Sequence, residues 1–378
     1  MNDADLVRTI CATLTDRPGD PAPLVHAEVR RLAPLCSEDE RRRLGDRALA
    51  HLRGLGELDA YVRDDTIDEV MVNAGRHIWI DTGGTLRHVG TLTDHRIEHL
   101  IERILAPLGR RVDRSSPIVD ARLADGSRIC AVLPPVAVDG ATLSIRRFRR
   151  QVLPVGSFTD EAGRDLLREL VDRRCNMVVA GATSSGKTSL VAAMLDGIDP
   201  GERLVVVEDT AELPVHHPHV VRLEARPATA DGPVPVDLAQ LVRTALRLRP
   251  DRLVVGEARG DEVLALVQAM NTGHDGSFST CHANSPLDAL LRLESLVLAA
   301  AASWPLDAIR QQLARSIDVI VQVERLADNR RQIVAISEVD HPSLTASPVA
   351  SPPTLRRLAH LDDLGGLVVD AAPRRSRR

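Results

Sequence analysis

One segment of the chain combines two glycines, several hydroxyl groups and a lysine at a spacing that suits phosphate binding. It fits the pattern G-x-x-x-x-G-K-T and reads Gly181-Ala182-Thr183-Ser184-Ser185-Gly186-Lys187-Thr188. An apolar run at residues 177–180 precedes it and a helical pattern at residues 189–195 follows it, which is the sequence context of a P-loop. In a P-loop, backbone N–H groups and the positive end of the following helix surround a phosphate.

Lys187 is the single lysine among the 48 basic residues of the chain, all the others being arginine. A lysine is a compact charge on a flexible stem that can reach the β- and γ-phosphates from inside the loop, whereas the bulkier planar guanidinium would not fit there. Thr188 offers a hydroxyl group to Mg²⁺. We therefore predict that ATP is bound by the consecutive residues Gly181, Ala182, Thr183, Ser184, Ser185, Gly186, Lys187, Thr188 and Ser189.

Two acidic residues follow apolar runs that are typical of buried strands. Glu208 directly follows the run 204–207, and Glu257 follows the run 253–255 after one glycine. Ligands of parallel sheets bind at such strand ends, and nucleotide hydrolysis needs acids that hold the metal and orient a water molecule. Both are therefore predicted catalytic residues, and Glu257 joins Thr188 as a predicted Mg²⁺ ligand, although the usual acid is aspartate. The alternative is that each acid caps the next helix.

A second dense segment, residues 273–284, clusters glycine, serine and histidine around a short strand-like stretch. It suggests a sensor that touches a phosphate or the attacking water. His282 could donate a hydrogen bond in that role. The alternative is an ordinary loop histidine.

The first half of the chain supplies a group of arginines that includes Arg128 and Arg146. P-loop enzymes often need an arginine from another domain or subunit to neutralise charge in the transition state. We predict this role for the group. The alternative is a solvated basic face that contributes little.

Helices and strands must position these residues, and the hydrophobic pattern that predicts them changes several times along the chain. Residues 1–55 have a helical pattern, and residues 56–150 have the short strands and turns of an α+β domain. Proline and glycine predict a linker at 151–158. Apolar runs then alternate with amphipathic helices over 159–340, which predicts an α/β domain with a mostly parallel sheet. Residues 341–378, rich in proline, serine and alanine, are predicted to be a mobile tail.

The composition is that of an ordinary globular protein, with 44% hydrophobic and 27% charged residues. Forty-eight basic and 53 acidic residues give a net charge of −5, and aromatic residues make up 2% of the chain. These values disfavour nucleic acid as a partner. No apolar run approaches the ~20 residues that span a bilayer, and the first residues do not have the pattern of a secretory signal. The expected location is the cytoplasm.

Several motifs taken together resemble those of the type II/IV secretion system ATPase superfamily, most closely the CpaF-like ATPases of tight-adherence (Tad/Flp) pilus assembly. The resemblance covers about residues 60–340. Besides the P-loop, the motifs that carry it are Asp68-Glu69-Val70-Met71-Val72-Asn73, Asp120-Ala121-Arg122-Leu123, Asp125-Gly126-Ser127-Arg128, Ser144-Ile145-Arg146-Arg147-Phe148, Glu208-Asp209-Thr210-Ala211-Glu212-Leu213, Leu246-Arg247-Leu248-Arg249-Pro250-Asp251-Arg252, Gly256-Glu257-Ala258-Arg259, Thr272-Gly273-His274-Asp275-Gly276-Ser277 and Ser279-Thr280-Cys281-His282-Ala283-Asn284.

The resemblance implies an α/β fold: a RecA-like P-loop motor domain with a parallel-rich sheet, preceded by a smaller α+β domain and a short helical segment. It implies a homohexamer that binds ATP and Mg²⁺ between the two domains of each subunit. Such a motor would drive inner-membrane platform proteins of a pilus or secretion system. It would lie in the cytoplasm, peripherally associated with the inner face of the cytoplasmic membrane.

The resemblance also implies roles for single residues. Glu208 lies in the segment called the Asp box and is a candidate general base. Glu257 corresponds to the Walker B acid, and the family carries glutamate there. His282 belongs to the His box, and Arg128 and Arg146 would reach the γ-phosphate.

Three other functions fit a P-loop. A RecA-like or conjugative motor would move nucleic acid, which the charge and the scarcity of aromatic residues disfavour. A nucleotide-dependent switch or scaffold would have negligible turnover, against which the presence of both Glu208 and Glu257 argues. A P-loop kinase would need a lid for a small substrate, and the sequence has no evident segment for one.

Overall fold

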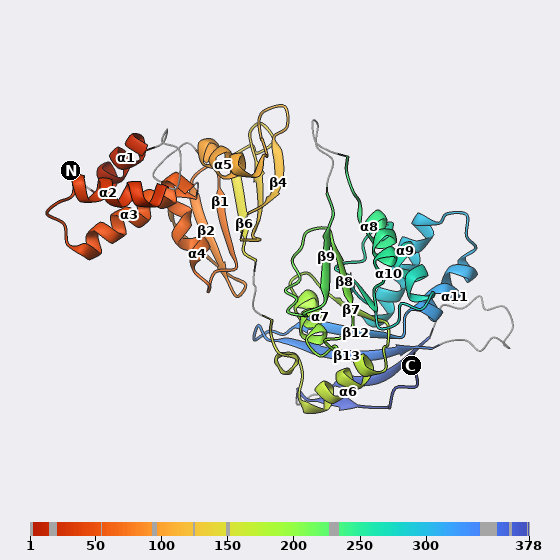
Figure 1. Cartoon of the computed structure of the whole chain (residues 1–378). Helices are drawn as coiled ribbons and strands as arrows, with labels where there is room; N and C mark the ends of the chain where they lie inside the picture. The colour runs from red at the N-terminus through yellow and green to blue at the C-terminus, as the bar shows by residue number, and fades with distance from the viewer. Residues whose placement is uncertain are drawn as a thin grey trace. The chain divides into compact units, whose positions relative to one another are not determined.

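The computed structural model describes residues 3–14, 21–53, 55–92, 97–123, 125–148, 152–226, 234–340, 354–362, 365–375 and 377. The chain divides into two compact units, Met1–Phe148 and Arg149–Arg378. Figure 1 colours the first unit from red to yellow and the second unit from yellow-green to blue.

The first unit begins with three helices, as residues 1–55 predict. They are α1 (Asp3–Leu14), α2 (Pro21–Leu32) and α3 (Glu38–Arg53). Their apolar residues recur every three or four positions, so each helix has one apolar stripe. The stripes meet in a small core that includes the fully buried Ile10, Val25 and Ala48.

An antiparallel sheet of six strands follows in the same unit, in the order β3-β2-β1-β6-β5-β4. The strands are β1 (Glu69–Asn73), β2 (His77–Thr82), β3 (Thr85–Thr91), β4 (Ile118–Arg122), β5 (Arg128–Val132) and β6 (Thr142–Arg146). Alternate residues such as Val70, Val72 and Ile145 are buried, and they pack in one core with α5 (Ile97–Leu105). This alternation is the pattern of a sheet with one buried face.

The second unit contains a sheet of nine strands in the order β15-β14-β13-β12-β7-β11-β10-β8-β9. Its parallel part consists of β12 (Val319–Arg325), β7 (Met177–Gly181), β11 (Phe278–His282), β10 (Arg252–Val255), β8 (Leu204–Glu208) and β9 (Val220–Glu224). Strand β13 (Arg331–Val339) pairs with β12 in the antiparallel sense. The predicted parallel-rich sheet is confirmed.

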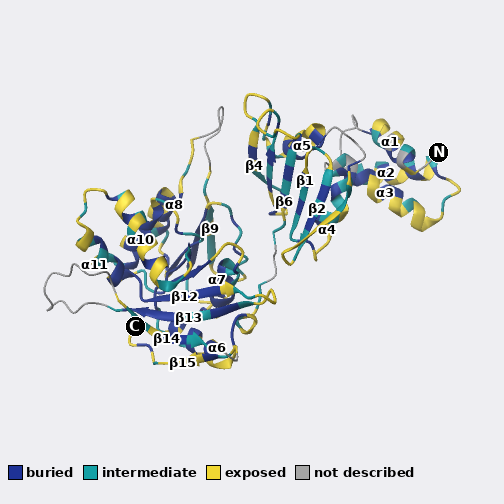
Figure 2. Cartoon of the chain, turned by 180° about the vertical axis from the view of Figure 1, so that it is seen from behind, coloured by how far each residue is buried: buried dark blue, intermediate teal, exposed yellow. Residues whose placement is uncertain are grey.

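Helices cover both faces of this sheet, because the central strands are apolar on both sides. In β7, Met177 and Val179 pack with α6 (Glu161–Asp172) and α7 (Lys187–Leu195). The intervening Val178 packs on the opposite face. That face carries α8 (Leu238–Ala245), α9 (Glu262–Met270), α10 (Pro286–Ala300) and α11 (Leu306–Ser316). Figure 2 shows the buried residues along the central strands.

The expectation of a mobile tail over residues 341–378 is wrong for the described residues 354–362, 365–375 and 377. Strand β14 (Leu355–Leu361) pairs with β13, and β15 (Leu367–Val369) pairs with β14. Leu358 and Ala359 are fully buried in the core of the second unit. The sheet therefore continues beyond residue 340, where the motor domain was expected to end. Residues 341–353 lie outside the described part of the chain.

None of the helices in the described ranges is both long and apolar enough to cross a membrane.

Candidate active site

The predicted site residues of the second unit gather at one edge of the nine-stranded sheet. Four neighbouring parallel strands, β7, β11, β10 and β8, all end at this edge. Gly181 is the last residue of β7 and lies opposite His282, the last residue of β11. Glu208 is the last residue of β8, and Glu257 follows β10 with only Gly256 between them. The topology thus brings the P-loop, both acids and His282 to one edge.

The P-loop connects β7 to α7, as the sequence predicts, and its geometry depends on glycine. Gly186 has a φ of +102°, a backbone conformation that residues with a side chain rarely adopt. A Cβ atom on Gly181 would lie 2.3 Å from the carbonyl oxygen of Val323 and 2.5 Å from Oγ of Ser185. Neither glycine can be replaced without moving the backbone around the loop.

The rest of the P-loop differs in exposure along its length. Ala182, Thr183 and Ser184 are exposed, whereas Thr188 and Ser189 are half-buried at the start of α7. Ser185 is buried, and no hydrogen-bond partner for its hydroxyl oxygen is found among the described residues. A turn with exposed backbone, followed by a helix and lined by an unsatisfied buried hydroxyl, fits the phosphate chain of a nucleotide.

Lys187 lies inside this turn, with 7% of its surface exposed. Its Nζ atom donates hydrogen bonds to the carbonyl oxygens of Gly181 (3.1 Å) and Ala182 (2.8 Å) and lies 3.2 Å from Nδ1 of His282. Burial lowers the pKa of Lys187, while the nearby Glu257 acts in the opposite direction. The two carbonyl oxygens thus hold the Lys187 ammonium group at the P-loop.

His282 connects Lys187 to Glu257. Its Nε2 atom lies 3.0 Å from Oε1 of Glu257, and its Nδ1 atom faces the ammonium group. Because a protonated lysine can only donate, Nδ1 must accept and the ring proton must lie on Nε2, where Glu257 accepts it. Burial and the Lys187 charge lower the pKa of His282, against the effect of Glu257. This arrangement favours a neutral imidazole.

Glu208 is held differently from Glu257. It is 4% exposed, and its Oε1 atom accepts hydrogen bonds from the backbone N–H groups of Glu212 (2.9 Å) and Leu213 (2.7 Å). Its Oε2 atom lies 3.5 Å from Nη2 of Arg222. Burial raises the pKa of Glu208, although the two N–H groups and Arg222 act in the opposite direction. One oxygen is therefore fixed by the backbone and the other by an arginine.

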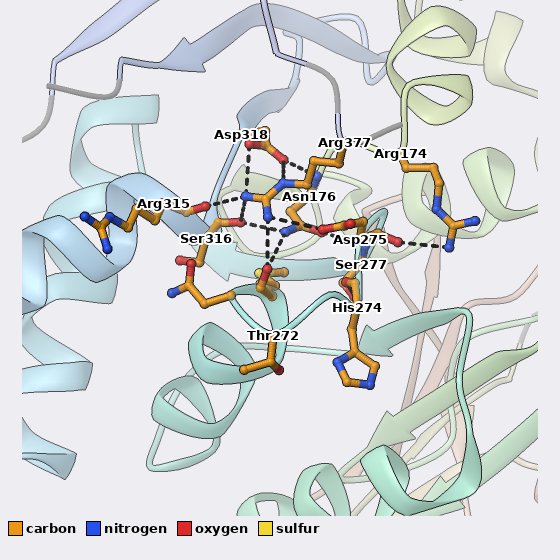
Figure 3. Close-up of polar contacts among 12 residues, drawn as sticks. Arg174, Asn176, Thr272, His274, Asp275, Ser277, Arg315, Ser316, Asp318 and Arg377 are labelled. Atoms are coloured by element: carbon orange, nitrogen blue, oxygen red, sulfur yellow. Dashed lines mark hydrogen bonds and ion pairs between the residues drawn. The ribbon is translucent and has the colours of Figure 1, made fainter. Parts of the chain in front are cut away.

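The second dense segment, residues 273–284, is divided between the two edges of the sheet. His282 lies beside the P-loop, but Ser277 immediately precedes β11 and so lies at the opposite edge. There the backbone N–H of Ser277 donates to Oδ1 of Asn176 (3.0 Å), as Figure 3 shows. The prediction that the whole segment senses a phosphate is wrong for residues 273–277, because β11 separates them from the site.

Arg128 and Arg146 lie in the first unit, on neighbouring strands β5 and β6. They are directly opposite each other in the register, with Arg122 of β4 opposite Arg128 and Glu69 of β1 opposite Arg146. Both predicted arginines are exposed. The structure thus places the two arginines side by side on one sheet, and their action on a nucleotide stays a prediction.

Three charged residues near the site were missed by the sequence analysis. Arg222 pairs with Glu208, and Arg259 pairs with Asp209 across the ends of β10 and β8. Arg331, at the start of β13, packs against the P-loop, because a Cβ atom on Gly186 would lie 2.7 Å from its Cδ atom. Arg259 belongs to the motif Gly256-Glu257-Ala258-Arg259, from which a role for it could have been predicted. Nothing in the sequence connects Arg331 to a loop so distant along the chain.

A parallel sheet with a P-loop after β7 and acids at the neighbouring strand ends defines the P-loop nucleotide-binding class. Within that class, the chain belongs to the family described as type II/IV secretion system protein, whose model matches residues 52–354. The resemblance seen in the sequence is thereby confirmed at the level of this superfamily.

Relatives agree with this assignment, and solved structures agree with the fold. A Mycobacterium tuberculosis protein whose name refers to conjugal transfer is 39% identical over 315 residues, covering 78% of this chain and 89% of that protein. The type IV secretion system protein PtlH of Bordetella pertussis is 30% identical, over 75% of this chain and 93% of PtlH. The pilus retraction motor PilT has a TM-score of 0.55 at 19% identity, over 84% of this chain and 83% of PilT. The Legionella pneumophila ATPase DotB also has a TM-score of 0.55, at 18% identity, over 76% of this chain and 82% of DotB. The predicted RecA-like fold is confirmed.

Proposed function

We propose that this protein is an Mg²⁺-dependent ATPase that works as a hexameric motor on inner-membrane platform proteins in pilus assembly or protein secretion. The observation that carries the proposal is the connected set Lys187, His282 and Glu257 at the edge where β7, β11 and β10 end. Nucleotide hydrolysis needs a P-loop lysine that binds phosphate and a nearby carboxylate, and His282 connects these two groups here. The family membership supports the secretion or pilus context.

Each residue has a separate task in the proposed hydrolysis. The P-loop residues 181–189 would hold the phosphates, with Lys187 neutralising charge on the β- and γ-oxygens. Thr188 and Glu257 offer oxygen atoms, the ligands that Mg²⁺ prefers, and bound Mg²⁺ would neutralise the charge that develops on the phosphates. Glu208 or Glu257 would accept the proton of the attacking water. His282 would keep the Glu257 carboxylate in place through its Nε2 proton.

Arg128 and Arg146 are proposed to stabilise the transition state from the first unit. Their juxtaposition on β5 and β6 supports this role, because a planar guanidinium pairs well with phosphate oxygens. If their action needs a ring, ATP hydrolysis must coincide with the hexamer in fractions separated by size. Arg128→Ala should elute as the hexamer with a lower rate. Arg87→Ala is the matched control, because Arg87 is an exposed arginine of the same sheet, on β3.

The experiment that tests the proposed pathway is co-purification with candidate membrane platform proteins in the presence of ATP. We expect Glu257→Gln, which should bind ATP without hydrolysing it, to capture the platform proteins of a pilus or secretion system. A Tad pilus system is the particular assignment we propose. Capture of no membrane protein by the ATP-bound hexamer would contradict the proposed role.

Translocation of nucleic acid is the second candidate, because several relatives are named for conjugal transfer. The net charge of −5 and the 2% aromatic content argue against a nucleic-acid track. Adding single-stranded or duplex DNA at low salt separates the two functions. A secretion or pilus motor should keep its ATPase rate, whereas a nucleic-acid motor should be stimulated in a salt-dependent manner.

A further inference from the structure

The end of the chain reaches the edge of the nine-stranded sheet that is opposite the P-loop. Three residues mark this edge, because each immediately precedes one of three adjacent strands: Asn176 before β7, Ser277 before β11 and Asp318 before β12. Beyond β15, the chain continues to Arg375 and Arg377, whose side chains enter the same region. Figure 3 shows Arg377 among these residues.

Arg377 uses all three guanidinium nitrogens in hydrogen bonds at this edge. Its Nε atom donates to Oδ2 of Asp318 (2.7 Å), and Nη1 donates to the carbonyl oxygen of Met270 (3.0 Å) and to Asp275 (3.2 Å). Its Nη2 atom donates to the carbonyl oxygens of Arg315 and Ser316 and to Oδ1 of Asp318. Two carboxylates and three carbonyl oxygens around one guanidinium make a nearly complete set of acceptors for its five N–H groups.

Arg375 binds the same Asp318 carboxylate. Its Nη1 atom donates to Oδ1 of Asp318 (2.8 Å), and Nη2 donates to the carbonyl oxygens of Ala314 (2.6 Å) and Val339 (2.9 Å). The Asp318 side chain is 0% exposed and also accepts from the backbone N–H of Asn176 (2.8 Å). Without the two arginines, this buried carboxylate would keep one hydrogen bond and no ion pair among the described residues, which is costly.

The acceptors and the arginines belong to different parts of the chain. Asp275 and Asp318 lie inside the segment 52–354 that matches the family model, whereas Arg375 and Arg377 lie beyond it. The final segment after Ala372 is held by the buried Pro373 and by polar contacts of Arg374, Arg375 and Arg377. None of the described residues after Ala372 belongs to a strand, so this segment can detach without breaking a strand pairing of the sheet.

We propose that Asp318, Asp275 and the surrounding carbonyl oxygens form a guanidinium-binding site, separate from the nucleotide site, whose ligand is the segment of this chain that follows Ala372. The peptide docks reversibly, with Arg377 and Arg375 as its anchors. The same peptide therefore binds in trans when the chain lacks its own end. This inference does not depend on the proposed motor function.

The direct test uses a chain that ends at Ala372 and a fluorescent peptide of residues 373–378. This shorter chain keeps β14 and β15, and its folding is checked by its circular dichroism and melting temperature. We expect saturable binding to the shortened chain and at least about tenfold weaker binding to the full chain, whose own end occupies the site at high effective concentration. Equal binding to both chains would overturn the proposal, because it would mean general charge attraction.

Substitutions in the peptide and the site sharpen this test. Arg377→Ala in the peptide, or Asp318→Asn in the shortened chain, should weaken binding by at least about tenfold, because charge-assisted hydrogen bonds are lost. Arg374→Ala in the peptide is the matched control and should change binding by less than about threefold, because the Arg374 side chain is exposed. A peptide that binds equally well without the Arg377 guanidinium would contradict the assignment.

A second measurement, made on the full chain, tests the proposal even if the shortened chain does not fold. Arg377→Ala should lower the melting temperature, and millimolar ethylguanidinium should restore part of it by filling the site. The same additive should not raise the melting temperature of the unaltered chain or of Arg374→Ala. The proposal fails if Arg377→Ala melts like the unaltered chain, or if ethylguanidinium has the same effect on all three.

Discussion

The Nδ1 atom of His282 lies 3.2 Å from Nζ of Lys187. The other ring nitrogen lies 3.0 Å from Glu257, so a single imidazole connects the P-loop lysine to the strand-end acid. The three residues come from α7, β11 and the loop after β10. A change in the charge of one of these residues therefore changes the electrostatic environment of the other two.

Replacing Lys187 with arginine should abolish ATP turnover although the positive charge is kept. The Nζ atom fits between carbonyl oxygens at 2.8 and 3.1 Å, and a planar guanidinium is too wide for that position. We expect the steady-state rate of ATP hydrolysis to fall by at least about 100-fold, close to the effect of Lys187→Ala. An arginine variant with a near-normal rate would show that the shape of lysine is not required.

The stability of the protein should decrease as the pH falls through about 6.5, partly because of His282. The pKa of its imidazole is lowered in the folded protein, so the unfolded chain takes up a proton near the ordinary pKa of about 6.5 before the folded protein does. The melting temperature should therefore fall between about pH 7.5 and about pH 5.5. His282→Asn should show a smaller fall than the unaltered chain, and identical falls would exclude this contribution.

Glu208→Gln should separate catalysis from folding. The amide oxygen can still accept from the N–H groups of Glu212 and Leu213, so the local structure should be kept. Because the folded state raises the pKa of Glu208, the carboxyl group stabilises the fold below about pH 4.5 and loses this effect as the pH rises. At neutral pH the variant should be at least as stable in urea. Its ATPase rate should fall by about 10²- to 10⁴-fold if Glu208 is the general base, and a normal rate would assign the base to Glu257.

The P-loop strand and helix could be predicted because their signal is contiguous. The glycines and Lys187 lie within eight residues, between an apolar run and a helical pattern. The contact between Lys187 and His282 could not be predicted in this way, because 95 residues separate them. Only the parallel pairing of β7 with β11 brings them together.

Two errors have physical causes that the sequence did not reveal. Residues 273–277 were grouped with His282, but a strand advances about 3.3 Å per residue, so β11 carries the two ends of the segment to opposite edges of the sheet. The proline, serine and alanine content of residues 341–378 is typical of a mobile segment, so it did not predict β14 and β15. The ion pair of Arg375 with Asp318 crosses 57 residues and has no local signal.

Arg252 should be important for stability rather than for catalysis. It is 1% exposed, and its guanidinium donates to both carboxylate oxygens of Glu202 (2.7 and 3.0 Å) and to the carbonyl oxygen of Val171 (3.1 Å). Arg252→Ala removes three hydrogen bonds and leaves Glu202, whose side chain is 13% exposed, with Arg174 as its remaining cation (3.1 Å). The free energy of unfolding in urea should therefore fall by about 2–3 kcal/mol. Arg243→Ala, at an exposed position of α8, should change it by less than about 0.5 kcal/mol. Equal effects would contradict the structural role.

The most direct test of the ATPase assignment is the turnover of Glu257→Gln, measured together with its affinity for ATP. The amide keeps the shape of the side chain and can accept the Nε2 proton of His282, but it can neither accept a proton from water nor offer a full charge to Mg²⁺. We predict that ATP still binds, because the P-loop and Lys187 are unchanged, and that hydrolysis falls by at least about 100-fold. A variant that hydrolyses ATP within twofold of the unaltered chain would contradict the assignment of this site.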